Sequence, residues 1–336
     1  MQALSKQPLS GRKALKFLTD NVIIIGIFVL AVVVSILRPN FIGESNIRNL
    51  LGNTAVRFII AVGVSGALIT KGTDLSAGRT AGLAACVSAI LLQRSDYANK
   101  FYPNLGDLPV VAVLAFVVGM TALIGAINGT VVAYFKVPPF IATLGMQTLV
   151  YGIALVYTGA QPLGSLRKDY TDIATGYIGN QIVSYIALIA LFVGVVMWLL
   201  YNKMRYGKYM YAIGGNEAAA EVAGVNVTRS KIRIYALAGM MYGLCGFLLA
   251  AKSGGASVNT AMGYELEAIA GCTIGGVSVN GGVGKISGIL IGVLVFEVLK
   301  IAMQFMGLKS DYTYIVQGLV IIIAVALDLR KYLAKK

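Results

Sequence analysis

The chain has 336 residues, of which 57% are apolar and 12% are charged, and it contains no histidine. Soluble domains carry about 25% charged residues, so this composition excludes an ordinary soluble protein. The net charge of +14 does not indicate nucleic acid as a partner, because the basic residues lie in tails and loops beside apolar runs instead of forming one basic face. Repeated apolar runs of about twenty residues predict an all-α polytopic membrane protein, since a helix satisfies its own backbone in lipid.

About ten membrane segments are expected within a single transmembrane domain, residues 1–336. The first covers residues 17–37 and is interpreted as a retained span, because no small-residue cleavage site follows it. Residues 71–79 lead into a small-residue segment that ends at residue 92. The remaining segments are expected at residues 54–70, 109–135, 140–157, 182–201, 234–251, 267–279, 285–306 and 313–327.

Glycines recur at every fourth residue in the later segments. Such stripes let helix backbones approach closely where lipid gives no hydrophobic drive for association. They predict helix contacts within the subunit or with a second copy. The stripes are Gly239 and Gly243, Gly271 and Gly275, and Gly284, Gly288 and Gly292.

The longest basic loop covers residues 202–233 and carries six Lys or Arg residues against two Glu residues. A short helix with its own caps is expected in its middle: Asn216 is a good N-cap, and Gly224 supplies a left-handed stop. A capped helix in a basic loop is interpreted as a docking element on the cytoplasmic side; the alternative is an ordinary solvated loop. The expected helix and its caps are Asn216, Glu217, Ala218, Ala219, Ala220, Glu221, Val222, Ala223 and Gly224.

The distribution of Lys and Arg predicts the orientation of the chain. With an even number of spans both tails share one side, and both tails are basic. The loop at residues 202–233 falls on the same side by parity, whereas the loop at residues 158–181 balances its charges. Both termini and the capped loop are therefore expected to be cytoplasmic.

Two glycine-rich stretches break the helical pattern. In the first, Gly72 precedes several N-cap residue types, so a helix is expected to restart there. Asp74 is then either a solvent-exposed cap or part of a transport path. In the second, residues 264–284, polar residues interrupt an apolar run, which predicts a re-entrant or broken helix. Residues 281–285 superficially resemble a phosphate-binding loop, but Ile286 stands where Ser or Thr is required, which argues against nucleotide binding.

Charged and sulfur-containing residues inside the spans are interpreted as structural. Glu297 and Lys300 are three residues apart, share a helix face and can neutralise each other; a structural pair or subunit contact is favoured over a proton relay. Arg57 is expected to snorkel from one end of its span. The cysteines are interpreted as buried small residues, neither disulfides nor metal ligands; they are Cys86, Cys245 and Cys272.

No catalytic constellation is present in the sequence. There is no histidine for a triad or a zinc site, no GxSxG motif and no carboxylate cluster that could hold a metal. We therefore expect a non-catalytic membrane protein that binds no cofactor.

Four stretches carry a resemblance to a known family: residues 70–79, 207–227, 264–284 and 325–332. Together with the hydropathy pattern, they make the chain similar to the inner-membrane permease subunits of bacterial ATP-binding-cassette sugar importers. That family serves galactose, ribose, xylose and arabinose, and the form of residues 72–79 most resembles its galactose/methyl-galactoside branch.

The resemblance implies a type II importer-like fold in the bacterial inner membrane, working as a homodimer with a sugar path between the two copies. It implies a cytoplasmic ATPase subunit, which binds ATP and Mg²⁺ and contacts the capped helix, and a periplasmic or lipid-anchored sugar-binding protein outside. The expected substrate is galactose, glucose or a methyl-galactoside, moved by alternating access; other pentoses or hexoses, an ion-coupled secondary transporter and a non-transporting scaffold are the alternatives. The path or gate residues expected on this basis are Thr73, Asp74, Ser76 and Asn280.

Overall fold

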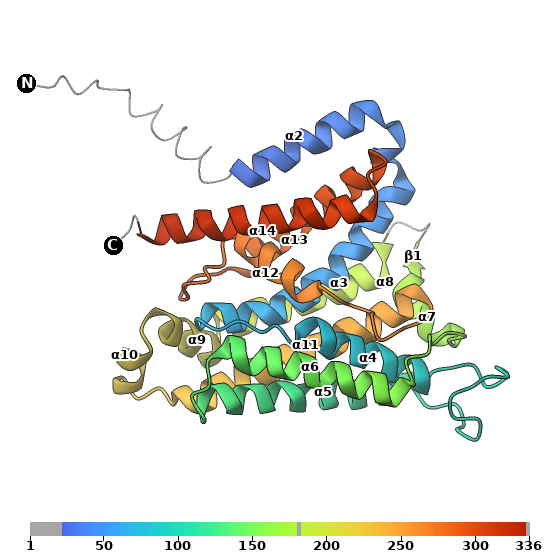
Figure 1. Ribbon diagram of the computed structural model, residues 1–336, viewed down its shortest axis with the longest axis horizontal. Coiled ribbons are helices and arrows are strands. Elements are labelled where there is room, and N and C mark those ends of the chain that lie inside the picture. The colour runs from blue at the N-terminus through green and yellow to red at the C-terminus, as the bar shows by residue number, and fades with distance from the viewer. Residues whose placement is uncertain (1–21, 180–182, 334–336) are drawn as a thin grey trace, which may run out of the picture.

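The computed structural model describes residues 22–179 and 183–333. Within these residues, seven helices are long and apolar enough to cross a membrane, and they lie roughly side by side along the long axis in Figure 1. Two shorter apolar helices and the broken helix α12 (Tyr264–Ile274) bring the membrane segments to ten, as the sequence predicts. The long helices are α3 (Glu44–Ile69), α5 (Val110–Ala133), α6 (Pro139–Thr158), α8 (Tyr185–Asn202), α11 (Val227–Ser253), α13 (Ile286–Phe305) and α14 (Ser310–Leu333); the shorter ones are α2 (Val22–Leu37) and α4 (Ala77–Leu91).

The remaining elements lie at the two ends of the bundle. α9 (Arg205–Gly215) and α10 (Glu217–Val222) form one end, on the left of Figure 1, where the last turns of α14 also lie. The opposite end carries α7 (Lys168–Thr175) and a small hairpin, β1 (Tyr177–Ile178) with β2 (Val183–Ser184). A short 3-10 helix, η1 (Pro39–Ile42), links α2 to α3.

Several helices differ from their expected bounds: α11 begins at Val227 and α14 ends at Leu333, seven and six residues beyond the expected spans. α3 begins at Glu44, ten residues before the expected span, because the polar turns around Asn46 and Asn53 continue the helix beyond its apolar part. α12 ends at Ile274 and does not reach residue 279, because Gly275 and Gly276, the latter with a left-handed φ, end the helix. Residues 17–21 of the first expected span lie outside the described residues.

The helix α3 forms the centre of the bundle. Of its most apolar 18-residue stretch, 89% is buried, and the helix packs against α8, α11, α12 and α13. Glycines allow the closest helix approaches: a Cβ placed on Gly239 would lie 2.1 Å from the Thr121 carbonyl oxygen. One placed on Gly292 would lie 2.0 Å from the Gly271 carbonyl oxygen. The glycine stripes therefore serve contacts within the subunit, as predicted. All three cysteines are free and buried.

Candidate functional site

The expected docking helix is present as α10, with the predicted caps. The Asn216 side chain accepts a hydrogen bond from the Ala219 amide at 3.0 Å, and Gly224 adopts a left-handed φ of +85°. Ala220 is buried against neighbouring apolar residues. On the outer side, Val222 is 91% exposed. The helix is thus capped at both ends and packed on one side, with an apolar side chain on its exposed side.

An ion pair fixes α10 to the helix that follows it. The Lys231 ammonium in α11 donates to Glu217 Oε2 at 2.7 Å. The helix α11 has an N-cap of its own, because the Asn226 side chain accepts a hydrogen bond from the Arg229 amide at 2.9 Å. α10 is therefore joined to the start of α11, a helix that runs the length of the bundle, by an ion pair.

The end of α9 meets the break between α3 and α4 and the loop after α12. Gly282 donates its amide to the carbonyl oxygen of Ile69, the last residue of α3, at 2.8 Å. Gly214, in α9, lies close to both of these residues: a Cβ on Gly214 would be 1.8 Å from the Ile69 carbonyl oxygen and 2.6 Å from the Gly282 backbone nitrogen. We call this meeting point of Ile69–Lys71, Gly214–Gly215 and Gly281–Gly282 the glycine junction.

The break between α3 and α4 holds the candidate path residues Thr73, Asp74 and Ser76. Asp74 is completely buried, so the solvent-exposed cap is the wrong interpretation of this residue. Its Oδ1 accepts from the Ser76 hydroxyl at 2.6 Å and from the Ser76 amide at 3.0 Å, while its Oδ2 accepts from the Tyr242 hydroxyl at 3.0 Å. Tyr242 is in α11, so the carboxylate joins the start of α4 to that helix.

The surroundings of this break are also polar. Asn128 of α5 donates to the Ser76 hydroxyl at 2.9 Å, and Thr143 of α6 accepts from the Leu75 amide at 3.1 Å. The segment Asp74–Ser76 is therefore bonded to three helices besides α4: α11 through Asp74, α6 through the Leu75 amide and α5 through Ser76.

Asn280 does not join the other three candidate residues. It lies in the loop between α12 and α13, where its backbone N–H donates to the Ser278 hydroxyl at 3.2 Å. That loop is held by α14, because Asp328 Oδ2 accepts from the Ser278 hydroxyl at 3.1 Å and the Val279 amide at 3.2 Å. Its nearest link to Thr73–Ser76 runs through the glycine junction.

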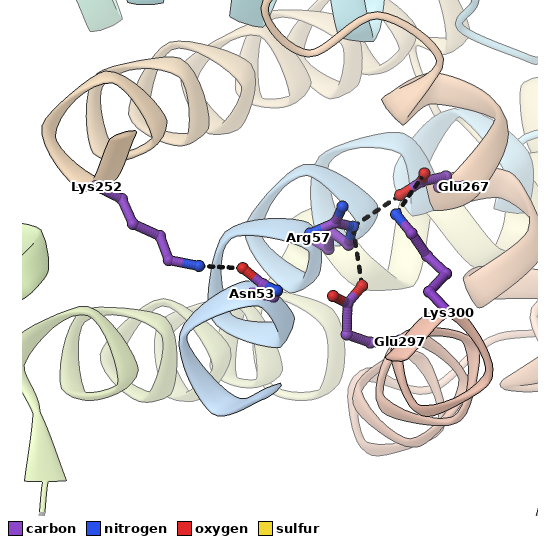
Figure 2. A network of polar contacts seen from close by, with 6 residues as sticks. All are labelled: Asn53, Arg57, Lys252, Glu267, Glu297 and Lys300. Atoms are coloured by element: carbon purple, nitrogen blue, oxygen red, sulfur yellow. Dashed lines mark hydrogen bonds and ion pairs between the residues drawn. The ribbon is translucent and has the colours of Figure 1, made fainter. Parts of the chain in front are cut away.

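A buried ionic network connects α3, α12 and α13 (Figure 2). Arg57 Nε lies 2.7 Å from Glu267 Oε2 and 3.1 Å from Glu297 Oε2, and Lys300 Nζ lies 2.8 Å from Glu267 Oε1. The predicted pairing of Glu297 with Lys300 is thus wrong: each pairs with a charge from another helix. Arg57 does not snorkel either, since its side chain is only 13% exposed. No local sequence pattern predicts these ion pairs, because they depend on which helices become neighbours.

The opposite end of the bundle carries a polar hollow of about 500 Å³ between α7 and the loop after α4. Arg167 pairs with Asp169, and its guanidinium holds the pKa of that carboxyl below its usual range. Arg94 pairs with Asp96 in the same way. Two antiparallel bridges, Gln93 with Leu166 and Leu163 with Ala256, hold these loops together.

Over residues 22–179 and 183–333, no group of three Cys, Asp or Glu side chains is placed to hold a metal ion.

Comparison with known proteins gives the family. Residues 46–325 match the family described as branched-chain amino acid transport system / permease component. The galactose/methyl galactoside import permease protein of Escherichia coli (strain K12) is 43% identical over 98% of this chain and 99% of its own length; that of Haemophilus influenzae is 41% identical over the same shares. The ribose import permease protein of Bacillus subtilis (strain 168) is 39% identical over 91% of this chain and 92% of its own length.

These relatives confirm the resemblance drawn from residues 70–79, 207–227, 264–284 and 325–332. No solved structure matches the chain at a significant level. The match spans the central helices, the break at Asp74, α10 and the ionic network. The chain therefore belongs to the branched-chain amino acid transport system / permease component family of membrane transport subunits.

Proposed function

We propose that this chain is the transmembrane permease subunit of an ATP-driven importer that carries galactose, glucose or a methyl-galactoside across the bacterial inner membrane. The observation that carries the proposal is the 43% identity to a galactose/methyl galactoside import permease over nearly the full length of both chains. Ribose is the second candidate substrate, because a ribose import permease is 39% identical.

The energy for transport comes from a separate cytoplasmic ATPase subunit, which binds ATP and Mg²⁺ and docks on α10. The exposed Val222 and the fixed helix around it support this assignment, since interface energy concentrates in a few apolar anchors. A sugar-binding protein, periplasmic or lipid-anchored, delivers the substrate to the opposite end. There the hollow beside α7 offers exposed charges of both signs.

The subunit works as a homodimer by alternating access, with both termini on the cytoplasmic side. The orientation is supported by α10 and the last turns of α14 lying at one end of the bundle. When the ATPases close, α10 moves as a rigid body and displaces the glycine junction, which repositions the break at Asp74. The well-packed helices respond as units because a close-packed core does not deform continuously.

Uptake by the reconstituted complex tests the proposal. Vesicles holding this chain with its ATPase and sugar-binding protein are loaded with ATP, and uptake of labelled galactose and labelled ribose is measured side by side. Uptake of galactose that requires ATP and both partners supports the proposal. Vesicles with this chain alone, under an imposed proton or sodium gradient, serve as the control; sugar uptake there would contradict it and indicate a secondary transporter.

A further inference from the structure

The segment between α11 and α12, residues 254–263, has no regular secondary structure and yet lies deep in the bundle. It starts near the loops at the α7 end, where Ala256 pairs with Leu163. It then runs along α4: a Cβ on Gly82 would lie 2.5 Å from the Thr260 carbonyl oxygen, and one on Gly78 would lie 2.6 Å from that of Ala261. Gly82 is nine residues from the end of α4, or about 14 Å at a rise of 1.5 Å per residue.

The same segment is partly uncovered. The Asn259 side chain is exposed and Met262 is 62% exposed, while Leu266 in the first turn of α12 is 48% exposed. At membrane depth, irregular backbone occurs only where protein covers it or where it lines a water-filled cavity, because lipid cannot hydrogen-bond to it. The exposed side of residues 257–263 therefore does not face lipid.

The side chains around this segment suit a neutral sugar. Arg79 donates to the Val258 carbonyl oxygen at 3.0 Å, and its guanidinium lies 4.1 Å from the centre of the Tyr151 ring of α6. A guanidinium has five N–H donors, and the bond to Val258 uses one of them. Glu265 lies behind this surface: it is 6% exposed, and its Oε2 is buried against α4, where a Cβ on Gly78 would be 1.9 Å from that oxygen.

Arg79 and Tyr151 can each interact with part of a sugar. Sugar hydroxyl groups accept from a guanidinium in charge-assisted hydrogen bonds. The apolar C–H face of a pyranose can pack against an aromatic ring such as Tyr151.

We propose that residues 257–263, with Arg79 and Tyr151, form a water-exposed wall of the sugar path that contacts the passing sugar. The proposal rests on the importer function proposed above and assigns a place in the chain to its substrate. Arg79 supplies transient polar contacts, and Tyr151 supplies the aromatic surface.

Thiol labelling of the complete complex tests this wall. Asn259→Cys is treated with a membrane-impermeant, charged methanethiosulfonate reagent. Phe192→Cys, on the regular helix α8 and 69% exposed, is the matched control, and the wild type reports on the three buried cysteines. We expect Asn259→Cys to react at least about tenfold faster than Phe192→Cys, since reaction needs a water-accessible thiolate, and galactose to slow it during ATP-driven transport.

Two outcomes would overturn the proposal while the complex still imports galactose. The first is an Asn259→Cys thiol that reacts no faster than the control. The second is an Asn259→Cys complex that crosslinks its two copies and resists the reagent, which would make the segment a subunit interface. A complex that carries no sugar at all contradicts the proposed function instead, so the two failures are distinguishable.

Discussion

The Lys71 ammonium donates to the carbonyl oxygen of Gly215 at 3.2 Å, which joins the break after α3 to the last residue of α9. Asn216, the N-cap of α10, follows Gly215 directly, and Asp74 lies three residues after Lys71. Lys71 itself has a positive φ of 61°, a conformation that L residues adopt at a cost. The start of α10 and Asp74 are thus linked through the glycine junction, to which Lys71 and Gly215 belong.

Gly214→Ala is expected to disturb the glycine junction. The added methyl group would meet the Ile69 oxygen and the Gly282 nitrogen, both of which are backbone atoms that cannot rotate away. Overpacking of this kind costs about 1–3 kcal/mol of stability. We expect a lower thermal unfolding temperature and ATP hydrolysis that responds less to sugar. Gly215→Ala is the control, because a Cβ there meets nothing within 4 Å; equal behaviour of the two variants would contradict the prediction.

Val222→Asp is expected to weaken the contact with the ATPase. The side chain is 91% exposed, so the fold should keep its stability to within about 0.5 kcal/mol. A carboxylate buried without a partner in the contact typically costs about 1–3 kcal/mol of binding or more. Titration of the purified ATPase against the detergent-solubilised subunit measures the affinity. Gln161→Asp, an exposed change at the opposite end, should bind normally; unchanged affinity of Val222→Asp would show that α10 does not dock through this residue.

Asp74→Asn is expected to slow uptake while the complex still assembles. The amide oxygen can continue to accept from Ser76, but the amide nitrogen replaces the oxygen that accepts from Tyr242. The measurement is sugar uptake by vesicles with equal amounts of assembled complex. A wild-type rate would rule out a role of this carboxylate in transport.

Arg57→Gln is expected to destabilise the bundle strongly. It leaves Glu267 and Glu297 buried beside each other with only Lys300 as a cation in the network. Removal of one partner from a buried ion pair costs about 3–5 kcal/mol. Thermal unfolding in detergent measures the loss. Arg94→Gln breaks an exposed pair with Asp96 and should leave the unfolding temperature unchanged. A similar effect of both variants would mean that the buried network contributes little.

The sequence by itself determined the features that depend on neighbouring residues in the chain. Ten membrane segments follow from the lengths of the apolar runs, since a helix satisfies its backbone locally. Asn216 and Gly224 were predicted as caps for the same reason, because a cap bonds only within three or four residues. The glycine spacing predicted close packing, although not which helices would meet.

Only the tertiary structure decided which distant side chains meet. Glu297 and Lys300 share a helix face, yet Arg57 and Glu267 lie as close to them and carry the opposite charges. Asp74 has the sequence context of an exposed cap, but α5, α6 and α11 cover it. Burial and ion pairing depend on helix neighbours that are over a hundred residues away, and no local pattern records that choice.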